Sequence, residues 1–307
     1  MRAAVIGAGH MGRYHAEKLA RIAGVQLAGV VDADAARAQA LAAKLGCPSF
    51  SHHREILGKA DAAVVAVPTD RHHAVALDCL RHGLHVLVEK PIATTLAEAD
   101  ALIGEAARRG LVLQCGHVER YNKAFRALTA RMDRPVFVEG ERLAGFKTRG
   151  AEVDVVLDLM IHDLDLAAAL ARAPVERVSA CGFRVLTRDI DIANARLEFA
   201  NGCVANLSAS RVSQAAVRKL RVFQPDLYVS ADLQGGRLRY VREANGAIAE
   251  TEEVHPGGDA LAEQAEAFVS SVVRQAPVEV DGQQGRRVLE LALEVGRLVR
   301  ERLSRFT

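Results

Sequence analysis

The fold is decided by residues 2–20, RAAVIGAGHMGRYHAEKLA. The apolar run before Gly7 predicts a buried strand, and the spacing of apolar residues from His10 onward predicts a helix. Gly7, Gly9 and Gly12 place a G-x-G-x-x-G turn between the two. In that context the first glycine permits a tight turn, the second lets a pyrophosphate approach the backbone, and the third lets the helix pack on the sheet. The turn therefore indicates a dinucleotide-binding unit.

Asp32 supports the same interpretation. It follows Gly12 by twenty residues and stands at the end of the apolar run Val25–Val31, where a carboxylate can accept both ribose hydroxyls of a dinucleotide. A carboxylate there repels a 2′-phosphate, which favours NAD over NADP, although Arg37 a few residues on can partly offset the repulsion. We therefore expect NAD, with NADP as the alternative, bound by Gly7, Gly9, His10, Met11, Gly12 and Asp32.

The chain up to about Gly116 alternates short apolar runs with amphipathic helical stretches. Strands this apolar, separated by helices, are typical of a parallel sheet covered on both faces. The pattern predicts an α/β Rossmann domain with a doubly wound parallel sheet. The expected strands are Arg2–Ile6, Val25–Val31, Ala62–Val67, His85–Val88 and Val112–Cys115, and the expected helices are His10–Ala23, Ala33–Leu45, His72–Arg81 and Leu96–Arg109.

The pattern changes after Gly116. From Val175 to Val254, successive strands with turn signals predict an open, mainly antiparallel sheet. We therefore divide the chain into a Rossmann domain, residues 1–118, and an α+β domain, residues 119–307. The other expected elements of the second domain are a helix from about Glu119, a strand at Pro135–Leu143, an apolar helix at Val153–Ala171, and helices at Asp259–Arg274 and Gln284–Ser304; the turn signals are Asn201-Gly202, Gly235-Gly236 and Asn245-Gly246.

Composition excludes several classes of protein. The 307 residues carry 40 basic and 38 acidic side chains, a net charge of +2, with no block of like charge, so we expect no nucleic-acid partner. No apolar run approaches the roughly 18 residues of a membrane span, and the N-terminus enters a strand with no room for a signal peptide. Five widely spaced cysteines without a C-x-x-C pair favour a reducing compartment. We expect a cytoplasmic protein with no membrane partner.

Lys90, Asp158 and His162 are candidates for acid–base chemistry. Lys90 follows the strand His85–Val88, at the strand end where open α/β sheets bind ligands, and can hold a hydroxyl or carbonyl oxygen. Asp158 and His162 lie four apart in an apolar helix, where polar side chains are costly unless partnered. His162 can accept the proton of an alcohol as hydride leaves its carbon, with Asp158 orienting the ring. A solvated lysine and a salt-bridged core histidine are the alternatives.

The remaining acidic and histidine residues do not point to a metal. No H-E-x-x-H pattern occurs, and the adjacent His72 and His73 would point to different faces of a helix. We therefore expect no metal site. Asp163 and Asp165 are left out of the mechanism, because they can be ordinary residues of a polar helix face.

Five motifs occur in order along the chain: Gly7-x-Gly9-x-x-Gly12, Val67-Pro68-Thr69 followed by His72, Glu89-Lys90-Pro91, Gly116-His-Val-Glu-Arg120-Tyr121, and Asp158-x-x-x-His162. Together they resemble the glucose–fructose oxidoreductase / inositol dehydrogenase family of nicotinamide-dependent sugar oxidoreductases, over essentially the whole chain. The resemblance implies an enzyme in which Lys90, Asp158 and His162 are catalytic. It also implies that the open sheet of the second domain mediates homo-oligomerisation. It places Pro68, Thr69, His72 and Glu89 beside the nicotinamide.

Three longer segments, residues 116–122, 154–166 and 191–211, narrow the resemblance. They are similar to the branch of the family whose members oxidise the 3-hydroxyl of UDP-N-acetylglucosamine to a ketone. In that branch an aminotransferase converts the ketone to the diamino sugar of lipid A. The resemblance therefore implies a sugar or nucleotide-sugar substrate, contacted by Lys90, Arg120, Tyr121, Asp158 and His162.

The residue types and their spacing do not by themselves identify that substrate. A nucleoside diphosphate needs positive charge, and Arg120, Arg142, Lys147 and Arg211 are candidates by position. Since the chain has no Trp, Tyr121 and Phe146 are the candidates for stacking. Two other functions stay open: a dehydrogenase of a free polyol or aldose such as inositol, and a non-catalytic sensor of sugar and NAD.

Overall fold

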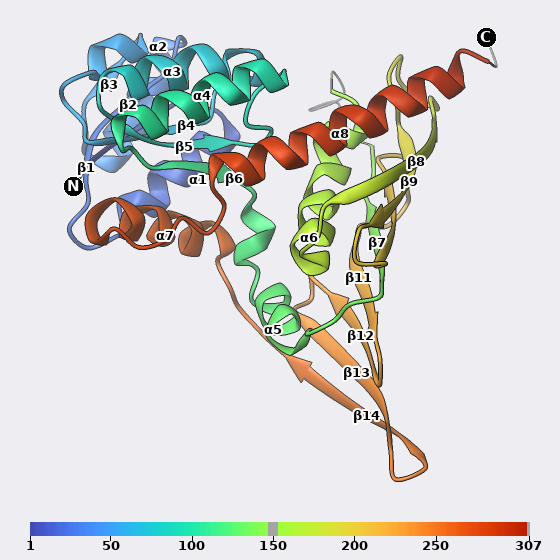
Figure 1. The fold of residues 1–307 in the computed structure, drawn as a ribbon. Helices are drawn as coiled ribbons and strands as arrows, with labels where there is room; N and C mark the ends of the chain where they lie inside the picture. The colour runs from blue at the N-terminus through green and yellow to red at the C-terminus, as the bar shows by residue number, and fades with distance from the viewer. Residues whose placement is uncertain (147–152, 306–307) are drawn as a thin grey trace. The chain divides into compact units, whose positions relative to one another are not determined.

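The structure is a computed structural model that describes residues 1–146 and 153–305 (Figure 1). The chain divides into two compact units. The first unit comprises Met1–Val118 and Asp259–Leu289, and the second comprises Glu119–Gly258 and Glu290–Thr307. The chain therefore leaves the first unit, returns to it and leaves it again.

Six strands form the sheet of the first unit: β1 (Arg2–Ile6), β2 (Gln26–Val31), β3 (Ser49–Phe50), β4 (Ala62–Val65), β5 (His85–Glu89) and β6 (Leu113–Gly116). Their order is β3-β2-β1-β4-β5-β6, and each neighbouring pair is parallel. The central strands are buried almost throughout, which explains their continuous apolar sequence. Strand β3 has only two residues, which are too few for hydrophobic periodicity to predict a strand there.

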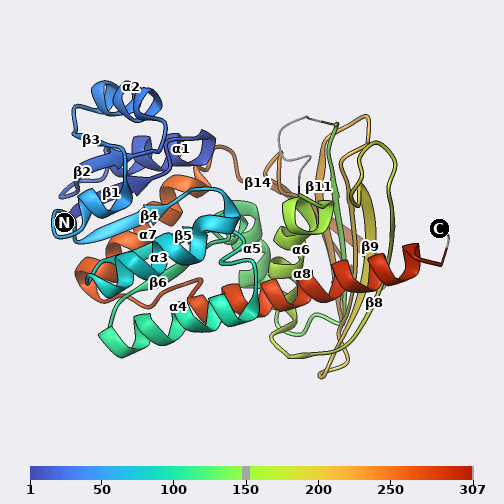
Figure 2. The ribbon, with the colours of Figure 1, turned by 90° about the horizontal axis from the view of Figure 1, so that it is seen from above.

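Four helices connect these strands: α1 (His10–Leu19), α2 (Ala35–Leu45), α3 (His72–Arg81) and α4 (Leu96–Arg109), with short helical turns η1 (His53–Ile56) and η2 (Thr69–Arg71). The sheet grows in one direction from β1 to β3 and in the other from β4 to β6. Right-handed crossovers therefore place α1 and α2 on one face and α3 and α4 on the other (Figure 2). The predicted doubly wound parallel sheet is confirmed, and its order reverses between β1 and β4.

Helix α7 (Ala260–Arg274) belongs to the first unit, although it follows the strands of the second unit in the chain. Ala265 and Phe268 on its apolar face pack in one core cluster with Leu19 of α1. The expected second domain comprised all of residues 119–307. The structure differs for residues 259–289, because an amphipathic pattern shows that a helix has an apolar face but not which surface that face covers.

Eight strands form the sheet of the second unit: β7 (Phe137–Leu143), β8 (Val175–Phe183), β9 (Ile192–Phe199), β10 (Val204–Ser210), β11 (Val217–Gln224), β12 (Leu227–Asp232), β13 (Arg237–Ala244) and β14 (Ala247–Val254). Their order is β14-β13-β12-β11-β7-β10-β9-β8, and every neighbouring pair is antiparallel except β7 with β10. The mainly antiparallel sheet is confirmed. The three turn signals, Asn201-Gly202, Gly235-Gly236 and Asn245-Gly246, lie between antiparallel neighbours as predicted.

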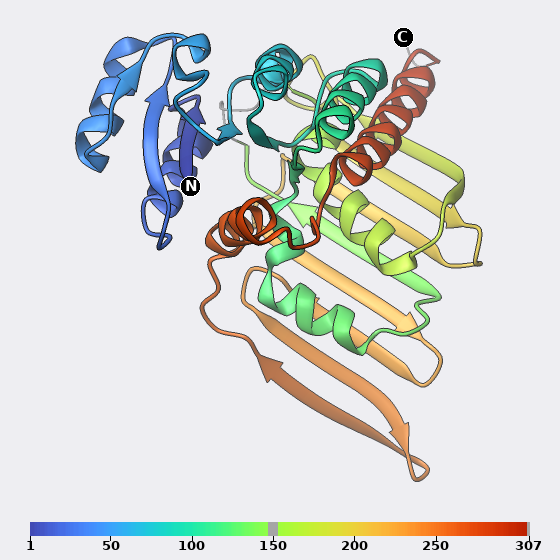
Figure 3. The same cartoon turned by 60° about the vertical axis from the view of Figure 1, so that its left-hand side comes forward.

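Helices cover one face of this sheet (Figure 3). They are α5 (Lys123–Arg131), α6 (Ile161–Ala171) and the part of α8 (Gly282–Leu303) that belongs to the second unit. Gly140 of β7 faces α6, because a Cβ added there would lie 3.6 Å from Cβ of Asp163. Residues on either side of Gly140 alternate between buried and half-buried, and the half-buried ones lie on the opposite face. Within the described residues no helix covers that face.

The longest helix of the described chain is α8, with 22 residues. Its outer face carries many charged side chains, among them Glu294, Arg297 and Glu301, which pair with one another. No helix within residues 1–146 and 153–305 is both long enough and apolar enough to cross a membrane.

Candidate active site

The three glycines of the first turn differ in what surrounds them. Gly7 has φ +97°, and a Cβ there would lie 2.4 Å from the carbonyl oxygen of Ala66. At Gly12 a Cβ would lie 1.6 Å from the carbonyl oxygen of Gly7. Gly7 and Gly12 are therefore required by the fold itself. A Cβ on Gly9, in contrast, would meet nothing within 4 Å. The open space at Gly9, at the N-terminus of α1, fits the close approach of a phosphate group.

Asp32 lies next to this turn. Its Oδ2 accepts a hydrogen bond from the backbone N–H of Ala8 at 2.7 Å, and its Oδ1 accepts one from Asp34 N–H at 2.8 Å. Nη1 of Arg37 lies 3.5 Å from Asp32 Oδ2, and Nη2 of Arg37 lies 3.2 Å from Asp34 Oδ2. The Asp32 carboxylate is thus fixed against the glycine turn, which is the arrangement that a ribose-binding carboxylate needs.

Two predicted cofactor residues, His10 and Met11, form the start of α1. His10 is exposed and Met11 half-buried, and the His10 ring packs edge-on against Tyr14 with ring centroids 4.8 Å apart. Their backbone N–H groups belong to the first turn of the helix, where intrahelical acceptors are absent. These groups and the helix dipole suit an anion, because both present positive charge at the N-terminus.

Lys90 follows β5 in the first unit, and its neighbour Glu89 is buried. Glu89 Oε1 lies 2.6 Å from Nε2 of His15, a fully buried side chain of α1, and Glu89 Oε2 accepts the backbone N–H of Lys90 at 3.2 Å. Burial raises the pKa of Glu89, but the hydrogen bond and electrostatic interaction with His15, together with the charge of Lys90, outweigh burial, so the pKa of Glu89 lies below its ordinary value. Glu89 is therefore a buried carboxylate.

The loop after β4 carries Pro68 and Thr69, and α3 begins at His72. Pro68 is exposed, Thr69 is half-buried and His72 is buried. Nδ1 of His72 lies 2.8 Å from the carbonyl oxygen of Pro91, and its Nε2 lies 2.9 Å from that of Val67. Burial lowers the pKa of His72, against the effect of these two carbonyls. Both ring nitrogens thus face the protein backbone.

Asp158 and His162 lie in the second unit, as half-buried residues. The predicted helix Val153–Ala171 begins with a π-helical turn, η4 (Val156–Met160), that contains Asp158, and continues as α6, which contains His162. Asp154 caps this segment by accepting Leu157 N–H at 2.9 Å and pairs with Arg300 of α8 at 2.9 Å. Single π-turns are rare and often occur at functional sites.

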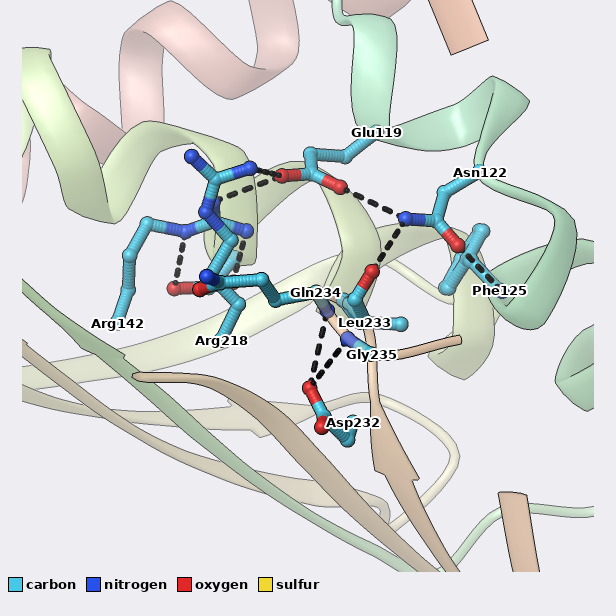
Figure 4. A network of polar contacts seen from close by, with 10 residues as sticks. Glu119, Asn122, Phe125, Arg142, Arg218, Asp232, Leu233, Gln234 and Gly235 are labelled. Atoms are coloured by element: carbon cyan, nitrogen blue, oxygen red, sulfur yellow. Dashed lines mark hydrogen bonds and ion pairs between the residues drawn. The ribbon is translucent and has the colours of Figure 1, made fainter. Parts of the chain in front are cut away.

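Asp163, next to His162, belongs to a buried ion cluster. Figure 4 shows three other members of this cluster, Glu119, Arg142 and Arg218. Arg142 of β7 donates from Nε and Nη2 to the two oxygens of Asp163 at 3.0 and 2.9 Å, and from Nη1 to Oε1 of Glu119 at 2.9 Å. Arg218 of β11 also reaches Glu119, at 3.3 Å. The two carboxylates hold the pKa of Arg142 above its ordinary value, although burial opposes this. The Arg142 guanidinium therefore pairs with carboxylates of the protein itself rather than with a substrate diphosphate.

The other residues suggested as substrate contacts lie in different surroundings. Arg120 lies 3.4 Å from the buried Asp165, and Tyr121 is fully buried with the Arg126 guanidinium over its ring. Arg211 donates from Nη2 to the carbonyl of Val153. Phe146 is exposed, and Lys147 lies outside the described residues. No observation tests a substrate role for Arg120 and Tyr121, which stays a prediction.

Sequence reasoning missed His15, Glu119 and the roles of Arg142 and Asp163. Their partners lie between 21 and 74 residues away in the chain, so no local spacing connects them. The one available signal was the presence of charged residues inside apolar segments. Among the described residues, no group of three or more His, Cys, Asp or Glu side chains is arranged to hold a metal ion.

A doubly wound sheet whose glycine turn and Asp32 lie at its point of strand reversal defines a dinucleotide-binding protein. Residues 1–117 match the model of an oxidoreductase family with an NAD-binding Rossmann fold, and residues 125–224 match the Gfo/Idh/MocA C-terminal domain. The chain therefore belongs to the Gfo/Idh/MocA family of oxidoreductases, which are enzymes that act on CH–OH groups.

Several relatives share this architecture. The UDP-N-acetylglucosamine 3-dehydrogenase of Acidithiobacillus ferrooxidans is 42% identical over 302 residues, which cover 96% of each chain. A solved structure of that enzyme matches with a TM-score of 0.93 over 97% of each chain. The scyllo-inositol 2-dehydrogenase (NAD(+)) of Bacillus subtilis is 30% identical over 236 residues, covering 69% of this chain and 68% of that protein.

Proposed function

We propose that this oxidoreductase oxidises the 3-hydroxyl of UDP-N-acetylglucosamine to the 3-keto sugar. The observation that carries the proposal is the 42% identity to an enzyme of that name, which extends over both units of the chain. The Rossmann unit alone would support only the use of a dinucleotide, because many dehydrogenases share it. The likeness of the second unit is therefore what argues for the nucleotide sugar.

NAD is the proposed cofactor. The negative charge of Asp32 beside the glycine turn favours a free 2′-hydroxyl and disfavours a 2′-phosphate. Arg37 lies on the carboxylates of Asp32 and Asp34, so its positive charge is already neutralised by two acidic groups. Gly7, Gly9, His10, Met11 and Gly12 would hold the pyrophosphate, and Pro68, Thr69, His72 and Glu89 belong to the loops and strand end proposed to form the nicotinamide side.

The proposed reaction removes a hydride from the substrate carbon and a proton from its hydroxyl, so that the C–O single bond becomes a carbonyl. NAD, when bound, accepts the hydride. His162 accepts the proton, because imidazole titrates near neutral pH. The Lys90 ammonium binds the same oxygen and stabilises the negative charge that develops as the proton leaves. Asp158 orients His162 and stabilises its charged form.

The catalytic roles are tested with His162→Ala and Lys90→Ala. Each variant should lose activity by a factor on the order of 100 or more, while NAD binding measured by calorimetry stays unchanged. His82→Ala and Lys44→Ala are matched controls, because both residues are exposed and lie outside the proposed site. Undiminished turnover by His162→Ala or Lys90→Ala would remove that residue from the mechanism.

A dehydrogenase of a free polyol or aldose is the second candidate, which the inositol dehydrogenase among the relatives favours. The two candidates differ in whether the uridine nucleotide contributes to binding. Uridine diphosphate should inhibit competitively against a nucleotide sugar if the first proposal is right. A lack of inhibition, together with turnover of inositol, would favour the free polyol. NAD binding without turnover of any sugar would instead indicate a sensor.

Two partners are part of the proposal. An aminotransferase would consume the 3-keto product, because a ketone is the substrate for transamination. A second copy of the chain would pack on the open face of the second unit's sheet. Phe137, Phe223 and Tyr228 support this, since their rings form a half-exposed row on that face with centroids 5.6 and 4.7 Å apart.

A further inference from the structure

Two buried histidines contact the residues on either side of Lys90. His15 contacts the side chain of Glu89, which precedes Lys90, and His72 contacts the carbonyl of Pro91, which follows it. Both histidines are almost completely buried, with 0% and 1% of their surface exposed. They reach Lys90 from different parts of the first unit, because His15 lies on α1 and His72 begins α3.

The contact on the Glu89 side is a chain of two hydrogen bonds. The His15 ring meets Glu89 Oε1 at 2.6 Å, and Glu89 Oε2 accepts the backbone N–H of Lys90 at 3.2 Å. Gly116 closes the space beside the carboxylate, since a Cβ added there would lie 2.9 Å from Glu89 Oε2. A carboxylate held at both oxygens and packed against a backbone has few positions to occupy. The backbone at Lys90 is thereby linked to the helix that begins at the glycine turn.

The contact on the Pro91 side joins two loops at the carboxyl end of the sheet. The His72 ring lies between the carbonyl oxygens of Pro91, at 2.8 Å, and Val67, at 2.9 Å. Pro91 follows Lys90, and Val67 precedes the loop Pro68–Thr69. Because proline lacks an N–H group, the carbonyl of Pro91 is its one strong backbone hydrogen-bonding group. His72 therefore fixes the chain immediately after Lys90.

We propose that His15 and His72 are positioning residues that hold Lys90 in its reactive place, His15 through Glu89 and His72 through Pro91. The proposal rests on the catalytic role proposed above for Lys90. In this arrangement neither histidine exchanges a proton with the substrate. Each histidine links the backbone beside the lysine to a helix and so limits where the lysine can lie. A small displacement of a reacting group lowers the rate, because catalysis depends on close alignment.

The two histidines use different nitrogens, which gives a sharp test. His15 reaches Glu89 through Nε2, whereas His72 reaches Pro91 through Nδ1. The amide nitrogen of glutamine takes the place of histidine Nε2, and that of asparagine takes the place of Nδ1. His15→Gln and His72→Asn should therefore keep the contact with the segment around Lys90. His15→Asn and His72→Gln should lose it, with nearly the same polarity and burial.

The experiment measures kcat, the KM for the sugar and the calorimetric NAD affinity for all four variants. We expect kcat of His15→Gln to exceed that of His15→Asn by about tenfold or more, and kcat of His72→Asn to exceed that of His72→Gln by a similar factor. NAD affinity should stay within about threefold in the two His15 variants, because the glycine turn, Asp32 and the loops of the proposed nicotinamide side are untouched. The His72 variants change a residue of that side, so they are compared by kcat at saturating NAD. The preferred amide is thus opposite at the two positions. A purely structural role predicts no such reversal in kcat among folded variants.

Equal kcat for the two variants at either position, or the same amide preferred at both, would overturn the proposal. If one pair does not fold, the other pair decides. If neither folds, Glu89→Gln decides, since it preserves shape but cannot accept both hydrogen bonds; an unchanged kcat would then refute the positioning role. Full activity of Lys90→Ala would overturn the proposed function as well. Inactivity of Lys90→Ala with wild-type kcat in all positioning variants would overturn this inference alone.

Discussion

The proposed preference for NAD over NADP depends on Asp32. Its carboxylate accepts the Ala8 N–H and also carries the charge that disfavours a 2′-phosphate. Arg37, 3.5 Å away, is the nearest cation that the structure gives to Asp32. Neutralising Asp32 therefore removes a repulsion and releases a guanidinium at the same time.

We expect Asp32→Asn to raise the ratio of kcat/KM for NADP to that for NAD by a factor on the order of 100. That ratio corresponds to about 2.7 kcal/mol, which is the size expected when a charge-assisted hydrogen bond to the 2′-hydroxyl is lost and one to the 2′-phosphate forms. Steady-state kinetics with both cofactors measures it. Asp34→Asn is the matched control, because Asp34 also contacts Arg37 but does not contact the glycine turn. An equal change of preference in Asp34→Asn would contradict the role assigned to Asp32.

Asp191 gives a residue-scale prediction on pH and stability. Its Oδ2 accepts the N–H groups of Val185, Leu186 and Thr187 at 2.7, 2.7 and 2.8 Å. Burial raises the pKa of Asp191, but these hydrogen bonds outweigh burial and lower it from 3.8 to about 2. Because the folded pKa lies below the unfolded value, the stabilisation is complete above pH 3.8 and is lost as the pH falls toward about 2.

Asp191→Asn should lower the free energy of unfolding by about 2 kcal/mol at neutral pH, since each pKa unit corresponds to about 1.4 kcal/mol. The difference from the wild type should shrink as the pH falls through this window. Urea unfolding between about pH 6 and pH 2 measures it, with Asp189→Asn as the neighbouring control. A difference that stays constant with pH would show that the ionised carboxylate is not the cause.

At the scale of elements, local spacing predicted the strands and helices of the first unit well. The apolar runs and the glycine turn are short-range signals, so β1, β2, β4, β5 and β6 and their connecting helices could be predicted from them. The placement of α7 against α1 and the parallel pairing of β7 with β10 could not. Both depend on contacts between segments far apart in the sequence.

The residues proposed for the site differ in how far the sequence alone places them. The glycine turn, Asp32 and Lys90 stand next to elements whose positions the sequence already indicates. Arg142 was suggested as a candidate for a substrate diphosphate, and the structure places it between Glu119 and Asp163 instead. An arginine in a strand carries no signal of its partner, because the pairing with Asp163 is made across two elements.

The anchoring of α6 leads to a prediction at this scale. Arg142→Met removes the cation between the buried carboxylates of Glu119 and Asp163, and uncompensated buried charge is costly. The free energy of unfolding should fall by about 3–5 kcal/mol in urea titration. Arg297→Met is the control, because Arg297 makes an exposed ion pair with Glu294, and exposed pairs contribute little to stability. Similar losses in both variants would show that the cluster does not anchor α6.

At the scale of the whole molecule, the open sheet face of the second unit is the proposed contact between copies. Phe223→Glu places a charge inside the row of Phe137, Phe223 and Tyr228, which an apolar interface does not tolerate. We expect the wild type to sediment as an oligomer and the variant as a smaller species with unchanged circular dichroism. An identical sedimentation coefficient for both proteins would place any contact elsewhere.

The proposed function is the removal of hydride from the sugar of a uridine nucleotide. To test it, the protein is incubated with NAD and one candidate substrate at a time, at alkaline pH and with a carbonyl trap that removes the product. The candidate substrates are UDP-N-acetylglucosamine, UDP-glucose, myo-inositol and glucose. Reduced-nicotinamide absorbance and product mass are recorded. We expect UDP-N-acetylglucosamine alone to lose two mass units while NAD is reduced. Turnover of only myo-inositol or glucose, with no reaction of either nucleotide sugar, would contradict it.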